Sequence, residues 1–406
     1  MKQVIFRSAV VILFVLAGCI SLDTQRTVTT GADRLCTDQA SLLAGKRVGL
    51  VTNHTGRLTT GEHLVDALVR QGTHVQALFG PEHGIRGVTE GGEHVVDSVD
   101  TKTGIPIYSL YGAISKPTPE MLKDLDVLVY DIQDVGVRFY TYISTMKLCM
   151  DAAAEQGIPF VVLDRPNPLG PLVDGPLIED SLRSFVGIVR VPVVYGLTIG
   201  ELATMINQRG WLDGGKKADL TVVWVDGWTR SMRAATPWVA PSPNIKHPGT
   251  VVVYPATCYL EATNVSEGRG TDLPFELFGA PWIQKEELAV RLNERKLPGV
   301  SFAPATFTPV SSKHSGVECQ GARLTVSDLL SYKPVLTGVT ILSVIRELYP
   351  DSLVVRARSL GRLLGVAGAH TSIMNHIPPA TIENGWSEEL HTYRDSLSQF
   401  RHYPLQ

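Results

Sequence analysis

The sequence lacks a long internal hydrophobic run and an excess of charge of either sign. No stretch beyond the N-terminal region reaches the ~18 consecutive apolar residues that a membrane-spanning helix needs. Lys and Arg number 37 against 40 Asp and Glu, a formal net charge of −3, so the composition gives no support for binding to nucleic acid. With 44% hydrophobic and 19% charged residues, the chain of 406 residues has a globular composition and room for two domains.

Several cofactor-binding and catalytic signatures are also missing. The chain has no G-x-x-x-x-G-K-[ST] loop, no G-x-S-x-G elbow and no H-E-x-x-H pair, and no G-x-G-x-x-G follows the first predicted strand. These absences disfavour a P-loop nucleotide site, an elbow serine hydrolase, a zincin and a dinucleotide site. The histidines lack tight ligand spacing, so we expect neither a metal nor a cofactor.

Cysteine is scarce, and none of the five cysteines forms a C-x-x-C pair, which argues against a zinc knuckle. Cys149 falls on a predicted buried helix face, where a free thiol is the simplest interpretation. The four cysteines after the N-terminal region allow three pairings, among which sequence cannot choose. Our preference is Cys258 with Cys319, the remaining cysteine being Cys36.

The N-terminal region resembles a bacterial lipoprotein signal. Two cations precede an apolar run over residues 9–17, which ends in Leu16-Ala17-Gly18-Cys19. We predict a signal peptide over 1–18 and lipidation of Cys19, the alternative being an ordinary signal with a chance cysteine. Membrane contact is then through the anchor only, facing the periplasm, and Ile20 in place of Asp favours the outer membrane by resemblance to Gram-negative sorting.

After a tether and first helix over 19–44, continuous apolar strands alternate with capped helices. Capping-box patterns at Thr59–Glu62 and Thr198–Glu201 open two helices, which we expect to end at Gln71 and Arg209. This alternation predicts a doubly wound α/β domain with a parallel sheet over 45–235. The predicted strands lie at 47–52, 74–79, 105–110, 126–131, 159–164 and 220–225.

Prolines crowd the sequence from Pro237 onward, and shorter segments rich in β-branched residues follow. Helices are predicted at 338–348 and 386–400. We interpret residues 236–406 as a smaller α+β domain.

Polar side chains follow four of the predicted strands. In open α/β sheets ligands bind beyond the carboxyl ends of the strands, so these segments predict a cleft along one edge. The residues concerned include Asn53, His54, Glu82, His83, Arg86, Asp131, Arg138 and Arg165.

The segment after the second strand is the most distinctive of these. Glu82 follows Pro81 and is framed by Gly80, Gly84 and Gly87, which let the backbone approach a ligand closely. A partly desolvated carboxyl there has a raised pKa and can give up a proton in catalysis. The alternative is an exposed acid in a loop whose glycines serve turns.

A second dense polar segment, Asn264 to Thr271, lies in the C-terminal domain. Arg269 can bind a substrate carboxylate with two hydrogen bonds, or it can pair with Glu267 in a network that only fixes the loop. Trp238 and the nearby segment ending in Asn244 are a possible sugar-binding wall or an ordinary linker.

Seven ordered motifs give the chain a close resemblance to the NamZ-type exo-β-N-acetylmuramidases, glycoside hydrolase family 171. The match runs from about Gly45 to the C-terminus. The motifs are Val48-Gly-Leu-Val-Thr-Asn-His-Thr-Gly56, Phe79-Gly-Pro-Glu-His-Gly-Ile-Arg-Gly87, Tyr130-Asp-Ile-Gln-Asp-Val-Gly-Val-Arg-Phe-Tyr-Thr-Tyr142, Asp164-Arg-Pro-Asn-Pro168, Pro241-Ser-Pro-Asn244, Asn264-Val-Ser-Glu-Gly-Arg-Gly-Thr271 and Pro274-Phe-Glu-Leu-Phe-Gly-Ala-Pro-Trp282.

The resemblance implies a Rossmann-like domain, a smaller C-terminal domain and a site between them. It also implies release of terminal N-acetylmuramic acid from peptidoglycan-derived muropeptides or disaccharides. Glu82 matches the family's proposed catalytic glutamate, and His83 is expected to tune it or to bind a sugar hydroxyl. The second catalytic role stays open between Glu267, Asp131 and the substrate's own N-acetyl group.

Selectivity for the lactyl carboxylate of muramic acid calls for a cation, with Arg269 the first candidate and Arg138, Arg165 and Arg86 the others. The remaining predicted substrate contacts are Asn53, His54, Tyr142, Asn244 and Asn264. An alternative function is a non-catalytic lipoprotein that binds muropeptides, and a third is an exported metal-dependent hydrolase. The oligomeric state is left open.

Overall fold

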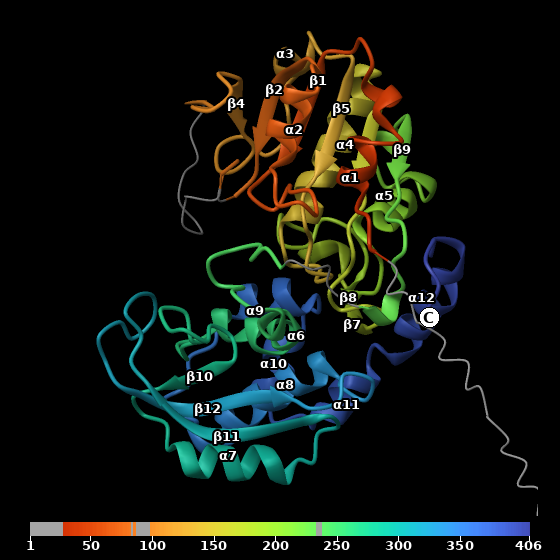
Figure 1. The fold of residues 1–406 in the computed structure, drawn as a ribbon. Coiled ribbons are helices and arrows are strands. Elements are labelled where there is room, and N and C mark those ends of the chain that lie inside the picture. The colour runs from red at the N-terminus through yellow and green to blue at the C-terminus, as the bar shows by residue number, and fades with distance from the viewer. Residues whose placement is uncertain (1–26, 83, 87–97, 233–237) are drawn as a thin grey trace, which may run out of the picture.

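The structure, a computed structural model, describes residues 27–82, 84–86, 98–232 and 238–406. Two lobes lie one above the other, joined by several crossing segments (Figure 1). The predicted signal peptide, Cys19 and His83 lie outside the described residues. Among the residues that are described, no helix is long and apolar enough to cross a membrane.

The upper lobe is built on a seven-stranded sheet in the order β3-β4-β2-β1-β5-β6-β9. All neighbouring strands are parallel except the short β3, which pairs antiparallel with β4. The predicted doubly wound α/β architecture is confirmed. The strands are β1 (Val48–Thr52), β2 (Val75–Gly80), β3 (Ser98–Val99), β4 (Pro106–Ser109), β5 (Val127–Asp131), β6 (Phe160–Leu163) and β9 (Leu220–Val223).

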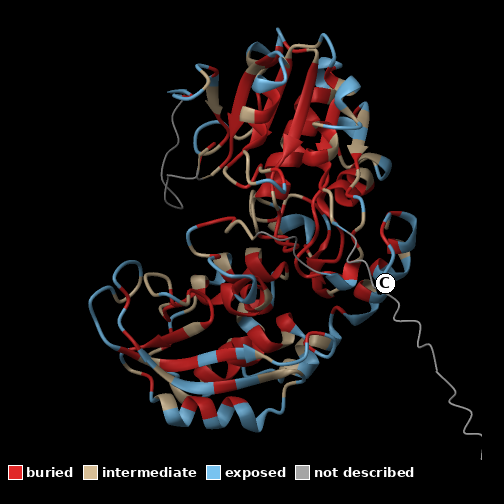
Figure 2. Cartoon of the chain, in the orientation of Figure 1, coloured by how far each residue is buried: buried red, intermediate tan, exposed pale blue. Residues whose placement is uncertain are grey.

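Helices cover both faces of this sheet, which explains why its central strands are apolar throughout. Figure 2 shows β1 and β5 buried along their whole length. The helices α1 and α2 share one hydrophobic cluster with β1 and β2, whereas α4 and α5 pack in the cluster on the other face. The bounds are α1 (Gly31–Leu35), α2 (Leu64–Arg70), α3 (Pro119–Leu122), α4 (Tyr142–Gln156) and α5 (Ile199–Gln208).

One predicted capping box is present and the other is not. Thr198 and Glu201 form the reciprocal pair at the start of α5. The helix expected from Glu62 instead begins at Leu64, where the buried ring of His63 accepts a hydrogen bond from the Val65 N–H. Thr59 does not cap this helix, because its hydroxyl and N–H both bind Asp33.

A two-stranded hairpin that sequence reasoning missed lies between β6 and α5. It consists of β7 (Val173–Leu177) and β8 (Pro192–Tyr195), which pair antiparallel. The C-terminal helix α12 (Ser387–Ser396) packs against β7, and the hairpin lies between the upper sheet and the lower lobe (Figure 1).

The lower lobe contains a three-stranded antiparallel sheet in the order β10-β12-β11 with helices around it. The helix α7 lies below this sheet, and α6 and α8 lie above it (Figure 1). This agrees with the predicted smaller α+β unit. The elements are β10 (Leu277–Ala280), β11 (Val300–Phe307), β12 (Cys319–Val326), α6 (Pro248–Thr257), α7 (Lys285–Glu294), α8 (Pro334–Leu348), α9 (Ala357–Leu364), α10 (Ala369–Met374) and α11 (Pro379–Asn384).

The end of the chain returns to the upper lobe. The Tyr403 hydroxyl donates to the buried carboxylate of Asp164, and its ring packs edge-on against Trp228. Burial raises the pKa of Asp164 to about 7. The last residues of the chain therefore pack against the upper lobe.

The cysteine pairing that we preferred is wrong. Cys36, Cys149, Cys258 and Cys319 are all free thiols. Cys258 begins a buried 3-10 turn after α6, whereas Cys319 opens β12 and its thiol contacts the Val317 carbonyl. Cys149 lies fully buried in α4, as predicted.

Candidate active site

The sheet order places a switch point between β1 and β5. From β1 the chain continues to β2 and β4 on one side, and from β5 to β6 and β9 on the other. Ligands of open α/β folds bind beyond the carboxyl ends of the strands at such a point. The segments beginning at Asn53 and Asp131 leave the two strands there, and Glu82 follows the neighbouring β2.

Glu82 is half-buried beside two hydroxyl groups. The Thr141 hydroxyl lies 3.4 Å from Glu82 Oε2, and the Tyr111 hydroxyl lies near the same carboxylate. Burial first, and then the Glu82 charge, raise the pKa of Tyr111 to about 12. Gly84 takes a positive φ of 69° two residues later, a conformation that favours glycine.

The buried amide of Asn53 directly follows β1. Its Oδ1 accepts hydrogen bonds from the N–H and hydroxyl of Thr55. Its Nδ2 lies near the Tyr142 hydroxyl but has no hydrogen-bond partner of normal geometry among the described residues. A buried donor without a partner costs free energy unless a ligand or water accepts from it.

The segment after Trp238 crosses the strand ends and ties them to the lower lobe. His54 Nε2 lies 2.8 Å from the Ala240 carbonyl oxygen, and the Tyr142 hydroxyl donates to the Pro241 carbonyl over 3.0 Å. The segment from Ala240 to Asn244 therefore contacts His54 and Tyr142, two predicted substrate contacts of the upper lobe, and itself carries a third, Asn244.

Asp131 and Arg165, predicted separately as catalytic and binding residues, are bound to each other. Arg165 donates from Nε to Oδ1 over 2.6 Å and from Nη2 to Oδ2 over 2.9 Å. The Asp131 side chain is fully buried. Burial raises its pKa and the guanidinium opposes that shift. The pair links the ends of β5 and β6.

Glu267 and Arg269 form ion pairs with each other and with neighbouring charged residues, as in the interpretation in which they fix a loop. The Glu267 carboxylate lies 2.8 Å from Lys313 Nζ and 3.3 Å from Arg269 Nε. Arg269 also pairs with Glu261 at 2.6 Å and stacks over the Phe275 ring. Both glycines beside Arg269 have positive φ. The side chain of Glu267 is only 3% exposed, whereas that of Arg269 is 30% exposed, so the charge of Glu267 is compensated inside the loop.

Three further predicted residues make internal contacts. Arg86 is bound between Asp66 and Asp100. Arg138 is fully buried and donates to the carbonyls of Pro176, Val191 and Leu363, and burial lowers its pKa to about 10. Asn264 holds the segment around Ser352 and Val354 through both ends of its amide.

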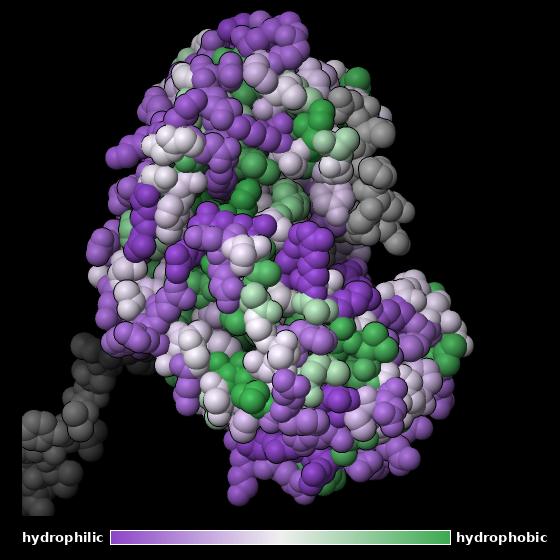
Figure 3. Space-filling model, turned by 180° about the vertical axis from the view of Figure 1, so that it is seen from behind, coloured by the Kyte–Doolittle hydropathy of each residue, from purple (hydrophilic) through white to green (hydrophobic). Residues whose placement is uncertain are grey.

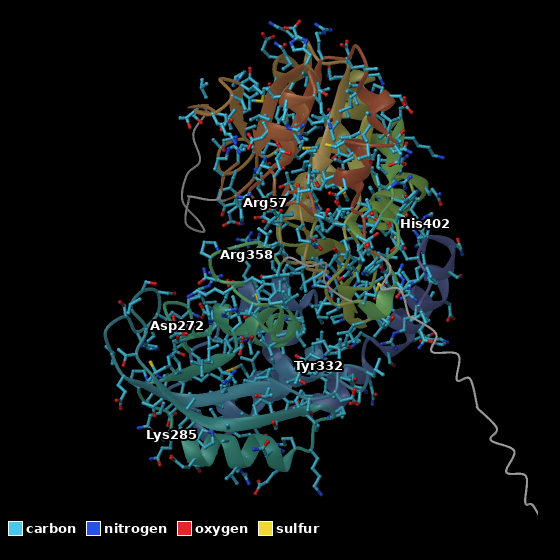
Figure 4. The ribbon with its side chains drawn as sticks, viewed as in Figure 1. Arg57, Asp272, Lys285, Tyr332, Arg358 and His402 are labelled. Atoms are coloured by element: carbon cyan, nitrogen blue, oxygen red, sulfur yellow. The ribbon has the colours of Figure 1, made fainter. Side chains whose placement is uncertain are left out.

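Sequence reasoning missed Tyr111 and Thr141, which contact Glu82. Tyr111 follows the predicted strand 105–110, so the rule that located the other strand-end residues also applies to it. It missed Arg57 and Arg358 as well. Arg57 lies at the edge of the upper lobe that faces the lower one, and Arg358 at the facing edge of the lower lobe (Figure 4).

A cavity of about 650 Å³ opens beside Asn244, which we call the rim cavity. Its walls come from residues 243–246, 269–272 and 307–312. Seen from behind, the outline of the molecule is indented between the lobes (Figure 3). The described part of the chain holds no cluster of three or more His, Cys, Asp and Glu side chains that could bind a metal ion.

A half-buried carboxylate at the switch-point edge of a Rossmann-like sheet is typical of the ligand site of an α/β enzyme. Comparison with known proteins identifies the particular family. The models of the N-terminal and C-terminal parts of the exo-β-N-acetylmuramidase NamZ match residues 48–249 and 252–403. The chain belongs to the NamZ family.

Individual relatives agree with this assignment. The chain is 47% identical over 381 residues to the peptidoglycan β-N-acetylmuramidase NamZ of Bacillus subtilis, covering 92% of this chain and 89% of that protein. Two crystal structures of DUF1343 family proteins from Bacteroides fragilis each cover 93% of this chain and 99% of their own. Their TM-scores are 0.87 and 0.78, at 37% and 32% identity.

Proposed function

We propose that this protein is an exo-acting glycosidase that removes N-acetylmuramic acid from the non-reducing end of peptidoglycan fragments during cell-wall turnover. The single observation that carries the proposal is the 47% identity to the Bacillus subtilis muramidase across 92% of the chain. The Glu82 site at the switch point supports it independently, because glycoside hydrolysis requires a carboxylic acid beside the scissile bond.

Glu82 acts as the general acid in this proposal. Its proton passes to the glycosidic oxygen as the bond from that oxygen to C1 of muramic acid breaks. The leaving sugar then departs as a neutral alcohol. Thr141 and Tyr111 orient the carboxyl group through their contacts with it.

We infer that the acetamido group of the substrate supplies the second catalytic function. The two carboxylates considered for this role are both in ion pairs, because Asp131 is bound by Arg165 and Glu267 by Lys313 and Arg269. The remaining candidate is the N-acetyl group of the substrate. The acetamido oxygen attacks C1 as the leaving group departs, forming a cyclic oxazolinium ion. Water then opens this ring and gives its proton to Glu82, so the anomeric configuration is retained.

In this proposal Arg57 and Arg358 bind the lactyl carboxylate of muramic acid. The four arginines predicted for this role are occupied by carboxylates or main-chain carbonyls. The Arg57 guanidinium donates to the carbonyls of His54 and Gly61, and neither Arg57 nor Arg358 forms an ion pair with another described residue. Their positions on facing edges allow both lobes to hold one substrate (Figure 4).

We also propose that the mature protein is a lipoprotein anchored through Cys19 and facing the periplasm. The support is the sequence Leu16-Ala17-Gly18-Cys19 after a short apolar run. Incorporation of a fatty acid analogue into the wild-type protein, and its loss in Cys19→Ser, tests this proposal. An unlabelled wild-type protein contradicts it.

The test of the function is product analysis with purified protein and the disaccharide in which N-acetylmuramic acid is β-1,4-linked to N-acetylglucosamine. We expect both free sugars in equal amounts, with the β-anomer of N-acetylmuramic acid appearing first by NMR. Binding of the disaccharide without turnover instead identifies a muropeptide-binding protein. An α-anomer formed first rejects participation of the acetamido group but not the glycosidase activity.

A further inference from the structure

The rim cavity is polar and lies outside the cluster around Glu82. Hydroxyl groups from Thr271, Thr308, Ser311 and Ser312 line it together with the Asn244 amide and the Asp272 carboxylate. A larger cavity of about 840 Å³ has a leucine-rich lining drawn from the hairpin region and the C-terminus, and none of the strand-end segments contributes to it.

A short chain segment connects the rim cavity to the catalytic edge. The Thr141 hydroxyl lies 3.4 Å from Glu82 Oε2, and Tyr142 is the next residue of the chain. Tyr142 binds the Pro241 carbonyl, and Asn244 lines the cavity three residues further on. Three extended residues span at most about 11 Å. The rim cavity therefore begins within about 11 Å of the contact between Tyr142 and Pro241.

The charges around the cavity cancel. Arg269 is paired with Glu261 and Glu267. Lys246 donates to the Thr271 carbonyl over 3.0 Å, and its charge is matched by that of Asp272. Asp272 makes no hydrogen bond or ion pair with another described residue, and it lies at the open left side of the lower lobe (Figure 4).

This lining suits an uncharged ligand with several hydroxyl groups. Hydroxyl side chains both donate and accept, an amide pairs with an acetamido group, and a carboxylate accepts from neighbouring hydroxyls of one ring. A peptide stem carrying several carboxylates requires an excess of positive charge, which the described lining does not provide.

We propose that the rim cavity is a binding subsite for the neutral amino sugar that leaves when muramic acid is released. This inference rests on the proposed function. Glu82 then lies at the junction between the terminal muramic acid and the N-acetylglucosamine that follows it. The subsite accounts for recognition of a glycan in place of an isolated muramic acid glycoside.

The experiment compares two substrates that differ only beyond the scissile bond. One is the muramic acid disaccharide, and the other is a nitrophenyl glycoside of N-acetylmuramic acid, which has no second sugar. We expect Asp272→Ala to lower the ratio of kcat/KM for the disaccharide to that for the nitrophenyl glycoside by about tenfold to a hundredfold, the effect of losing charged hydrogen bonds. Thr308→Val is expected to lower it by a smaller factor.

The matched control is Asp351→Ala, an exposed aspartate of the lower lobe outside the cavity, which should leave the ratio unchanged. An unchanged ratio in Asp272→Ala, or an equal loss on both substrates, overturns the subsite. A loss confined to substrates bearing a peptide stem also overturns it and assigns the cavity to the stem. If the wild-type protein hydrolyses neither substrate, the proposed function itself fails.

Discussion

The two densest polar segments of the chain, around Glu82 and around Glu267, differ in how their charges are satisfied. Glu267 is almost fully buried between two cations, and Arg269 beside it holds a second carboxylate. Glu82 is half-buried and contacts the hydroxyls of Thr141 and Tyr111. In the sequence both segments are acids framed by glycines. In the structure Glu267 lies in an ion-pair network, whereas the described contacts of Glu82 are with hydroxyl groups.

The comparison shows why polar density alone does not identify a site. A buried charge is stable only when it is paired and hydrogen-bonded, so a loop that carries a glutamate into the interior needs cations beside it. A catalytic acid needs to exchange a proton with substrate, and an ion pair on both sides prevents that. The predictions below test the contrast between the two segments.

The largest effect is expected from Glu82→Gln. The change keeps the shape and hydrogen-bonding capacity of the side chain but removes its proton donor, and general acid catalysis contributes about 10²–10⁴-fold. We expect kcat on the disaccharide to fall by that factor with the melting temperature unchanged. A loss of only a few-fold on this poor leaving group removes Glu82 from the acid role.

The second prediction concerns stability at the other segment. Glu267→Gln removes one partner of a buried ion-pair network and leaves Lys313 and Arg269 near one another, a change that costs about 3–5 kcal/mol in comparable cases. We expect a lower midpoint in urea unfolding, with kcat/KM of the folded protein close to wild type. A stable variant with lost activity reverses the roles that we assign to the two glutamates.

The third prediction compares Arg57 and Arg358 with Arg269, the arginine beside Glu267. Arg57→Gln and Arg358→Gln are each expected to reduce the preference for muramic acid glycosides over N-acetylglucosamine glycosides by about tenfold, the effect of losing a charged hydrogen bond. Arg269→Lys serves as the comparison and is expected to lower stability but not the preference. If only Arg269→Lys changes the preference, its ion pair with Glu261 opens during binding and our assignment is wrong.

The smallest effect is expected from pH at His63, which supports the loop carrying Asn53. Its ring lies between the Asn53 carbonyl and the Val65 N–H, and burial lowers the pKa of His63 to about 4 from an ordinary value of 6.5. The folded state therefore binds the proton less readily than the unfolded state. Its contribution to stability is complete above about pH 6.5 and is lost as the pH falls toward 4.

We expect this dependence to flatten in His63→Asn, in which the side chain still accepts from the helix N-terminus but does not titrate. Melting temperatures between pH 4 and 7 measure the slope for the two proteins. Parallel slopes would show that His63 does not carry the pH dependence.

The sequence by itself determined the upper lobe and the location of the candidate acid. Continuous apolar strands require cover on both faces, which restricts them to a parallel sheet between helix layers, and the sheet forms as predicted. Strand-end position then placed Asn53, Glu82 and Asp131 along one edge, because carboxyl ends of parallel strands meet there. Local patterns also located α5 and the buried thiol of Cys149.

Only the tertiary structure decided which polar groups pair with one another. Asp131 and Arg165 are 34 residues apart in the chain, and Lys313 reaches Glu267 from 46 residues away, so no local spacing reports either pair. The same holds for Tyr111 and Thr141 at Glu82 and for the rim cavity, each of which brings distant segments together. Whether two cysteines pair likewise depends on how close the fold brings them. Hydrophobic periodicity encodes which residues are buried, whereas charge pairing depends on which strands and loops become neighbours after folding.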